Sequence, residues 1–593
     1  MKKQKLSFIS ILLVTVMLIG VLAACNNKNP SQPTTQETNK AEDTMGTETE
    51  GKISDSNAEG ETTATETETE TETETEYADL KLPEADKTML IGDGSTVSFS
   101  QNVTADDYAC AVAYVQRGGF STYSADTIGI SSRATLTKGD EYYTLVYNKE
   151  LCELTIVHSE SGANALPKQS DSANYEKLCE TSVTQHYSKE INGMGYIFRL
   201  EDGSFIVYDG GYETDAKDLL LTISKLRITD NIHIRAWVIT HDHNDHYSAF
   251  KEIADMGGKR MVIDYVMYAP TTAEEAKEPN YYAKQLHEDT SKLGATLIPV
   301  HAGMTFSFAD VKLEILQTPS MLTIHGKIAD FNDTSIISRV VNDDGSIMML
   351  ADACGRSADW LVKNIGNGLK SDFVQVAHHG VETGSIPLYD AIAAPTLFWP
   401  CDQSLLASQR GEKIKQHIIE AEYSVEHILH SYGNVTRTLA YRPTAPETMD
   451  IMPTDTNLIT TDAAGNATNV RIEDGILKFD IADPKDPHII IDFSNVELGD
   501  KNEIRMVVDA NDAKEGFVFL KTKVDSGFTS AKGIPIGNQG TSEDGKTTYI
   551  IYLGAVAGFK DGLKALRIDF GSEAGQTVEI YSMVISNLDL SDK

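Results

Sequence analysis

The position of polar residues after apolar strands constrains the fold of residues 184–445 more than any other feature of the sequence. Here, short apolar segments with strand character alternate with segments whose apolar residues have helical spacing. Directly after four of these strand-like segments come Asp209, the segment Thr240–His246, Asp352 and the pair His378-His379. Ligand sites of open α/β sheets lie at the carboxyl ends of strands, so these four places are expected to meet. The pattern predicts an α/β domain with one polar site.

The segment THDHNDH, Thr240 to His246, contains three of the 15 histidines of the chain. His241 and His243 are two residues apart on an extended loop, so their side chains can point the same way. Asp245 and His246 turn toward a second position as the next helix begins. A hydrolytic metal site requires such imidazoles and carboxylates around an open position for water. The loop can therefore supply ligands to two adjacent metals; a solvated polar loop is the alternative interpretation.

Four motifs in order carry a resemblance to a known family. HxHxDH at His241, preceded by VYDGG with Asp209 and followed by LADAC and VAHHG, resembles the metallo-β-lactamase superfamily. The resemblance covers residues 184–445. Within the superfamily, NDTSIISR, SIMMLADA and DFVQVAHHG look most like the metallohydrolase domain of DNA-uptake competence proteins and their exported relatives. The resemblance to the superfamily implies an αββα sandwich and a metal-dependent hydrolase.

The resemblance also implies which residues hold two divalent metal ions. His241 and His243 would bind the first metal, Asp245 and His246 the second, and Asp352 would bridge them. Asp245 could also orient the attacking water or accept its proton, and would then be the catalytic residue.

The final ligand would be His378 or His379, and we prefer His378 because it lies closer to its strand. Asp209 would support the HxHxDH loop without touching metal. Most of the superfamily has another histidine before the SIISRVV strand, where this chain has Asn332 and Asp333. Asn332 would be a weak oxygen ligand of the first metal. Zinc is the expected ion, and manganese is the alternative because oxygen ligands suit it.

Two such metals would supply metal-bound hydroxide near neutral pH, so hydrolysis of an ester or phosphodiester is expected. The first hypothesis is a phosphodiesterase or nuclease-like hydrolase acting on a small-molecule or cell-wall phosphodiester. Nucleic acid is disfavoured as a partner by the net charge of −37, because its capture normally relies on a basic surface. The second hypothesis is hydrolysis of a lactone, thioester or β-lactam. The third is a non-catalytic surface-binding lipoprotein with a vestigial metal site.

The N-terminal residues have the layout of a secretory signal, with three lysines, a short apolar run and small residues. The run ends in Leu22-Ala23-Ala24-Cys25, which resembles the lipobox of bacterial lipoproteins. Residues 1–25 are therefore expected to be a signal peptide with lipidation at Cys25. Residues 26–77, rich in Thr and Glu, predict a disordered stalk. The protein would then be extracellular, anchored by lipid to the outer face of the cytoplasmic membrane.

Two further regions flank the metal-binding domain. Residues 78–183 predict a small α+β domain and linker, in which Cys110 and Cys152 could form a disulfide. Residues 446–593 contain short alternating strands and predict a β-sandwich, similar to the jelly-roll modules appended to surface carbohydrate enzymes. None of the three tryptophans lies in this region. It is either a purely structural module or one that contacts glycans.

Overall fold

The described part of the chain belongs to one compact unit, Thr75–Lys593. The computed structural model describes residues 80–169, 175–258, 261–272, 283–326, 328, 330–381, 384–509, 516–537, 545–570 and 573–590. The predicted signal peptide with Cys25 and the predicted stalk lie outside the described residues. No helix within these ranges combines the length and hydropathy that a membrane span needs.

The first region is an antiparallel sheet with one helix, α1 (Ala105–Arg117), which begins with a capping box formed by Thr104 and Asp107. The sheet has the order β1-β2-β6-β5-β4-β3. Its strands are β1 (Lys87–Leu90), β2 (Thr96–Ser100), β3 (Ser121–Ile128), β4 (Ser131–Lys138), β5 (Glu141–Asn148) and β6 (Glu153–Ser159). Ala111 and Val115 of α1 are buried against this sheet. Cys110 and Cys152 do not form a disulfide.

A seven-stranded mixed sheet with the order β12-β11-β10-β9-β8-β7-β20 follows. Its strands are β7 (Ser182–Gln185), β8 (Gly195–Arg199), β9 (Phe205–Asp209), β10 (Ile232–Val238), β11 (Met261–Tyr268), β12 (Thr296–Pro299) and β20 (Val435–Thr438). Strands β9 to β12 run parallel to one another. The sequence predicted a domain boundary between residues 183 and 184. Strand β7 crosses this boundary, and its pairing with β8 makes it part of the sheet.

A second seven-stranded sheet has the order β13-β14-β15-β16-β17-β18-β19. Its strands are β13 (Thr305–Phe308), β14 (Val311–Gln317), β15 (Ile337–Val341), β16 (Ser346–Met349), β17 (Phe373–Gln375), β18 (Thr396–Trp399) and β19 (Glu426–Leu429). Strands β16 to β19 are parallel. The hairpin that the sequence predicted from TSIISRVV to SIMMLADAC is β15 and β16.

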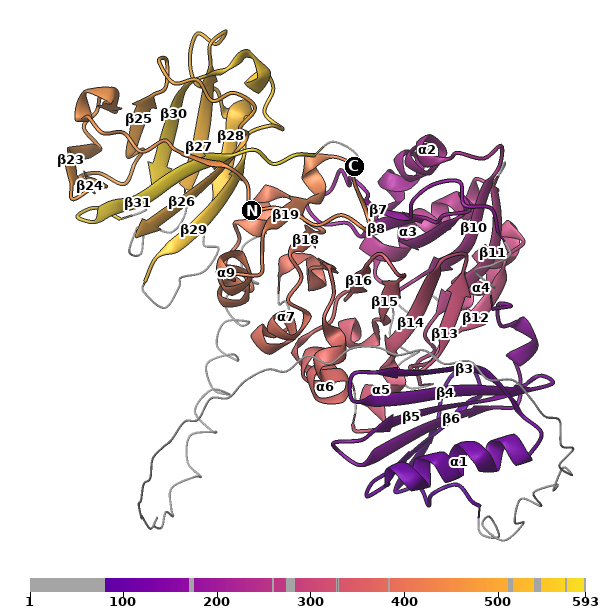
Figure 1. The fold of residues 1–593 in the computed structure, drawn as a ribbon. Helices are drawn as coiled ribbons and strands as arrows, with labels where there is room; N and C mark the ends of the chain where they lie inside the picture. The colour runs from indigo at the N-terminus through magenta and orange to yellow at the C-terminus, as the bar shows by residue number, and fades with distance from the viewer. Residues whose placement is uncertain are drawn as a thin grey trace, which may run out of the picture. The chain divides into compact units, whose positions relative to one another are not determined.

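Three buried apolar clusters order these elements into layers (Figure 1). One cluster lies between the two sheets, with Tyr208 and Val238 of the first sheet packed with Val340 and Met349 of the second. Helices pack on the outer face of each sheet. Those on the first sheet are α2 (Ala216–Leu226), α3 (Asn244–Asp255) and α4 (Ala283–Leu293). Those on the second are α6 (Gly355–Ile365), α7 (Ile386–Ile392) and α9 (Glu412–Glu420). The order is helix, sheet, sheet, helix. Two shorter helices are α5 (Pro319–Thr323) and α8 (Gln403–Leu406).

The last region contains two antiparallel sheets around one apolar core. The first consists of β21 (Thr448–Asp450), β23 (Ala467–Glu473), β24 (Ile476–Ile481), β26 (Glu503–Asp509), β29 (Thr547–Tyr552) and β31 (Thr577–Ser586). The second, ordered β22-β25-β30-β27-β28, consists of β22 (Ile459–Thr461), β25 (His488–Asp492), β27 (Gly516–Thr522), β28 (Gly533–Ile536) and β30 (Leu563–Phe570). The mixed α/β class and the predicted β-rich C-terminal region are thus confirmed.

Candidate metal centre

The histidine-rich loop connects a buried parallel strand to a helix. Strand β10 ends at Val238, and α3 begins at Asn244 with His243 as its N-cap in extended conformation (φ −76°, ψ 153°). The loop is fixed to the second sheet by the backbone N–H of Ile336, which donates to the carbonyl of Thr240 over 2.9 Å. The first residues of the predicted site therefore lie at the carboxyl end of a parallel strand, where the sequence placed them.

Asp209 lies behind this loop, at the end of β9, and is fully buried. Its Oδ1 accepts the backbone N–H of Thr240 over 2.8 Å. Its Oδ2 accepts the Thr240 hydroxyl over 2.7 Å and the Nδ1 of His246 over 2.8 Å. Because a carboxylate only accepts, we assign a proton of His246 to Nδ1, which leaves Nε2 as the nitrogen that would bind a metal. These contacts are those expected of a residue that supports the loop.

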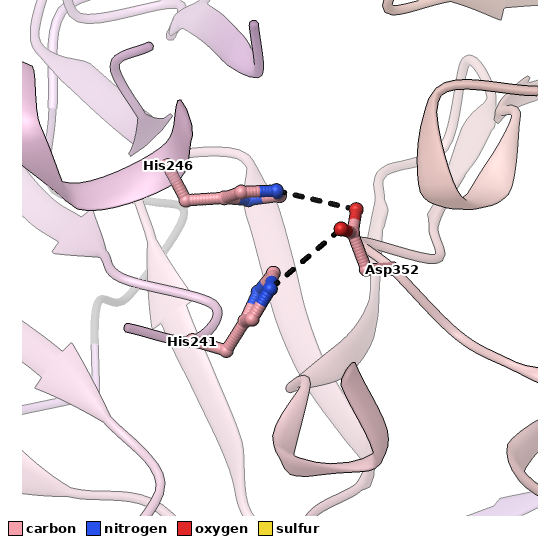
Figure 2. Close-up of side chains that lie close together, drawn as sticks. All are labelled: His241, His246 and Asp352. Atoms are coloured by element: carbon pink, nitrogen blue, oxygen red, sulfur yellow. Dashed lines mark ion pairs between the residues drawn. The ribbon is translucent and has the colours of Figure 1, made fainter. Parts of the chain in front are cut away.

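Asp352 faces two groups of histidines with its two oxygens. Its Oδ1 lies 3.2 Å from Nε2 of His246 and 3.6 Å from Nε2 of His379. Its Oδ2 lies 3.6 Å from Nε2 of His241 and 3.8 Å from Nε2 of His378. Figure 2 shows the imidazoles of His241 and His246 pointing at this carboxylate, one at each oxygen. Asp352, which follows β16, therefore lies between two groups, as a bridging ligand would.

The structure does not support the preference for His378 over His379. His379 is buried, and its Nε2 also lies 3.1 Å from Oδ2 of Asp245. His378 is more exposed and lies beside Asn332, whose Nδ2 is 3.4 Å from Nε2 of His378. Two successive left-handed residues (φ 46° and 55°) direct the two rings to different oxygens of Asp352. Closeness to the strand does not separate the two histidines, because the backbone turns sharply at this point and both rings face Asp352.

Hydrogen bonds orient the ligands of the group around Asp245. Nδ1 of His379 lies 2.8 Å from the carbonyl of Pro400, which can only accept, so Nε2 is again directed to the site. The side-chain amide of Asn192 donates to Asp245, and the hydroxyl of Tyr212 donates to Asn192 over 3.2 Å. The sequence analysis did not identify Asn192 or Tyr212. Tyr212 follows the VYDGG motif closely, but nothing in the sequence around Asn192 marks it.

On the other side, Nε2 of His241 lies 3.0 Å from Nδ1 of His243. His243 is partly buried and its ring lies 5.5 Å from that of Phe331. Asn332 is 5% exposed and lies in a short 3-10 helix, Phe331–Thr334, before β15. The predicted site residues are therefore all brought to one place, with Asn332 at its margin next to His378.

The donor set fits divalent cations. Two sets of three residues, which share His246, have ligand atoms within 4.8 Å of one another. They are His241, His246 and Asp352, and Asp245, His246 and His379. Among the described residues, Nε2 of His246, Nε2 of His379 and Oδ1 of Asp352 are buried and make no hydrogen bond. Buried polar atoms are normally hydrogen-bonded, so their convergence here is best explained by ligation. Histidine nitrogen with carboxylate oxygen suits zinc, manganese and iron.

The charges of the protein alone show how strongly these groups interact. Burial would lower the pKa of His246, but the carboxylates of Asp352 and Asp209 outweigh it and hold this pKa well above its usual value. Burial would raise the pKa of Asp352, but His246 and His379 hold it well below its usual value. Burial and the neighbouring His246 lower the pKa of His241. In the metal-free chain at neutral pH, Asp352 is therefore ionised and His241 is neutral, while His246 carries an extra proton that a cation at its Nε2 would displace.

Comparison with known families identifies part of this region. Residues 192–333 match the model of the metallo-β-lactamase superfamily. The matched stretch contains the histidine-rich loop and Asn332, and it confirms the resemblance for that part of the chain. A match of this kind suggests a metal-dependent hydrolase or a related enzyme. The comparison with curated proteins gave no match.

Solved structures show only distant likeness. CmlA, a diiron β-hydroxylase from Streptomyces venezuelae, is 15% identical with a TM-score of 0.31, and the match covers 44% of this chain and 54% of CmlA. The chain thus spans about half the length of that protein. A carbohydrate-binding module of family 29 is 10% identical with a TM-score of 0.19, and the match covers 24% of this chain and 91% of the module.

Proposed function

We propose that the protein is a dinuclear metal-dependent hydrolase that cleaves phosphodiesters at the bacterial cell surface. The observation that supports it most is the position of Asp352 between two groups of imidazoles. A single ion would need only one of these groups. One cation would be held by His241, His243, His378 and Oδ2 of Asp352, and the other by Asp245, His246, His379 and Oδ1 of Asp352.

Two bound divalent cations would lower the pKa of a water molecule and neutralise charge that develops on the substrate oxygens. The chain's own residues hold this arrangement rigid. Asp209 and the carbonyl of Pro400 fix the tautomers of His246 and His379. Burial would raise the pKa of Asp245, but His379 and His246 hold it well below its usual range. Asp245 is therefore ionised in the metal-free chain, and as a carboxylate it would orient a water molecule or accept its proton.

The phosphodiester class is favoured by charge and by Asn332. A phosphodiester brings a negative charge that a pair of cations can neutralise. Asn332 occupies the position of a histidine that β-lactam hydrolases of the superfamily would use, so the pattern departs from theirs. The net charge of −37 favours a small or cell-wall substrate over long nucleic acid. The surface location rests on the lipobox sequence that ends at Cys25.

The test measures metal content and substrate range of the purified full chain. Two ions per chain, by mass spectrometry of the metals, and turnover of bis-p-nitrophenyl phosphate support the proposal. Asp352→Asn should reduce this turnover by at least about 100-fold. The matched control is Asp310→Asn, whose carboxylate accepts hydrogen bonds from Thr181 and Asn342 away from the site. Turnover of carboxyl esters, lactones or β-lactams alone would favour the second hypothesis, and absence of bound metal would overturn the proposal.

A further inference from the structure

The outer face of the β22-β25-β30-β27-β28 sheet carries two neighbouring aromatic side chains. Strand β27 alternates in burial, so that Val518 and Leu520 point into the core of the last region while Phe517 and Phe519 point outward. Phe517 is 46% exposed. Outward positions of a half-buried strand are normally polar. Single exposed apolar residues are common, but two adjacent ones on a strand are a feature that needs an explanation.

The two rings lie close to each other on a prepared surface. Their centroids are 5.7 Å apart and their planes differ by 29°. Phe519 is paired with Gly533 of β28, and a Cβ atom at position 533 would lie only 2.5 Å from Cε1 of Phe519. The ring thus occupies the space that a side chain at 533 would need. Glycine at this position allows Phe519 to lie against the neighbouring strand.

Charged groups of known geometry border the rings on the other side. Arg567 of β30 is paired with Phe519, and its guanidinium carbon lies 5.2 Å from the centre of that ring. Arg567 also donates two hydrogen bonds of 2.7 Å to the two oxygens of Asp569, which is paired with Phe517. His488 of β25 is paired with Asp569 on the other side of β30. The result is a surface with rings on one side and fixed donors and acceptors beside them.

The geometry points to a binding site for a neutral glycan chain on this face, formed by Phe517, Phe519, Arg567, Asp569 and His488. A sugar ring has an apolar C–H face, which can lie on an aromatic ring, and hydroxyl groups at its edge. Those hydroxyls match a guanidinium and a carboxylate that are already held side by side. The inference does not depend on the metal centre or on the proposed hydrolase.

Two other classes of ligand are excluded, an anionic polymer by charge and a protein partner by area. Arg567 contacts two carboxylates, those of Asp569 and Asp486, so its positive charge is neutralised and an anionic polymer gains little. Two aromatic side chains supply at most about 300–500 Å² when fully buried. A standard protein interface buries about 800 Å² on each partner. A neutral chain of sugars needs no more surface than this face offers.

The test is affinity gel electrophoresis of the full chain in soluble xylan, mannan and β-glucan, with an anionic polysaccharide alongside. We expect retardation by at least one neutral glycan, weakened roughly ten-fold in Phe517→Ala and largely restored in Phe517→Tyr, which keeps a flat ring. Val524→Ala, also at an exposed apolar residue (69% exposed) but in the segment after β27, is the matched control and should bind normally. Thermal unfolding checks that each variant is folded.

The inference is overturned by three results: no neutral glycan binds, Phe517→Ala binds as well as the unchanged chain, or only the anionic polymer binds. The assay is repeated with a chelator, and the variants are also assayed for phosphodiester turnover. Glycan binding should survive chelation and turnover should survive Phe517→Ala. Failure of this proposal is therefore distinguishable from failure of the proposed function.

Discussion

Replacing Asp209 by asparagine tests whether hydrogen bonding behind the loop determines metal affinity. The carboxylate accepts three donors, which are the N–H and the hydroxyl of Thr240 and Nδ1 of His246. An amide has only one oxygen. If its NH₂ group takes the place of Oδ1 it faces the N–H of Thr240, and if it takes the place of Oδ2 it faces the hydroxyl of Thr240 and Nδ1 of His246. Either way, at least one buried donor loses its acceptor, which costs about 1–3 kcal/mol.

The second orientation also favours the other tautomer of His246, with the proton on Nε2, where it blocks the metal. We therefore expect Asp209→Asn to weaken metal binding about 10–100-fold, which corresponds to about 1.4–2.7 kcal/mol. The assay is a metal titration against a competing chelator, with denaturant unfolding measured in parallel.

Asp310→Asn provides a closely matched control. Its Oδ1 accepts the N–H of Glu201 over 3.1 Å, and its Oδ2 accepts two side-chain donors. Both variants should lose stability, but only Asp209→Asn should lose metal affinity. Equal metal affinity in the two variants would refute the argument that the support of His246 controls the site.

Three further predictions follow from the contacts of the site and of the first region. His379→Ala should lower metal affinity more than His378→Ala, because His379 is the more deeply buried of the two imidazoles. The same metal titration checks this. A larger loss in His378→Ala would contradict the proposed ligand role of His379. Asn192→Ala should reduce kcat about ten-fold with little change in KM, since the carboxylate that it orients would rotate; unchanged kcat would show that the amide is dispensable. Burial would raise the pKa of Asp93, but its hydrogen bond and charge interaction with His301, together with its hydrogen bonds from Ser95, outweigh this and lower the pKa. The stabilisation is then complete above about pH 4 and is lost as the pH falls further. The unfolding free energies of the unchanged chain and Asp93→Asn should therefore converge in acid, and a pH-independent difference would contradict this.

The elements of the fold that carry the site could be predicted from the sequence because their patterns are local. The apolar run before Thr240 and the run before Asp352 both became parallel strands, β10 and β16, and their ends meet. Asp209 likewise comes at the end of a parallel strand, β9, and lies behind the loop. What could be predicted was thus the set of residues that meet, since strand ends define it.

The orientation of individual side chains could not be predicted in the same way. His378 and His379 both have left-handed backbone angles, which no spacing rule predicts, and these angles direct the two rings to different oxygens of Asp352. Asn192 reaches Asp245 across 53 residues of sequence, and a lone asparagine carries no motif. Phe517 and Phe519 fit the alternation of any strand, so the sequence does not say which face of the sheet they occupy. The pairing of β27 with β30 places them on the outer face. These features depend on tertiary contacts.

The ligands around Asp352 come from both sheets, and this has a consequence for folding. His241 and His246 follow a strand of the first sheet, whereas Asp352 and His379 follow strands of the second. Cations bound here would join the two sheets at one edge. Free energy of binding then becomes free energy of cohesion between the halves, about 2.7 kcal/mol when the free ion is at 100 times its dissociation constant. A cell that withholds these ions would weaken the contact between the two sheets at this edge, while the apolar cluster between them would remain.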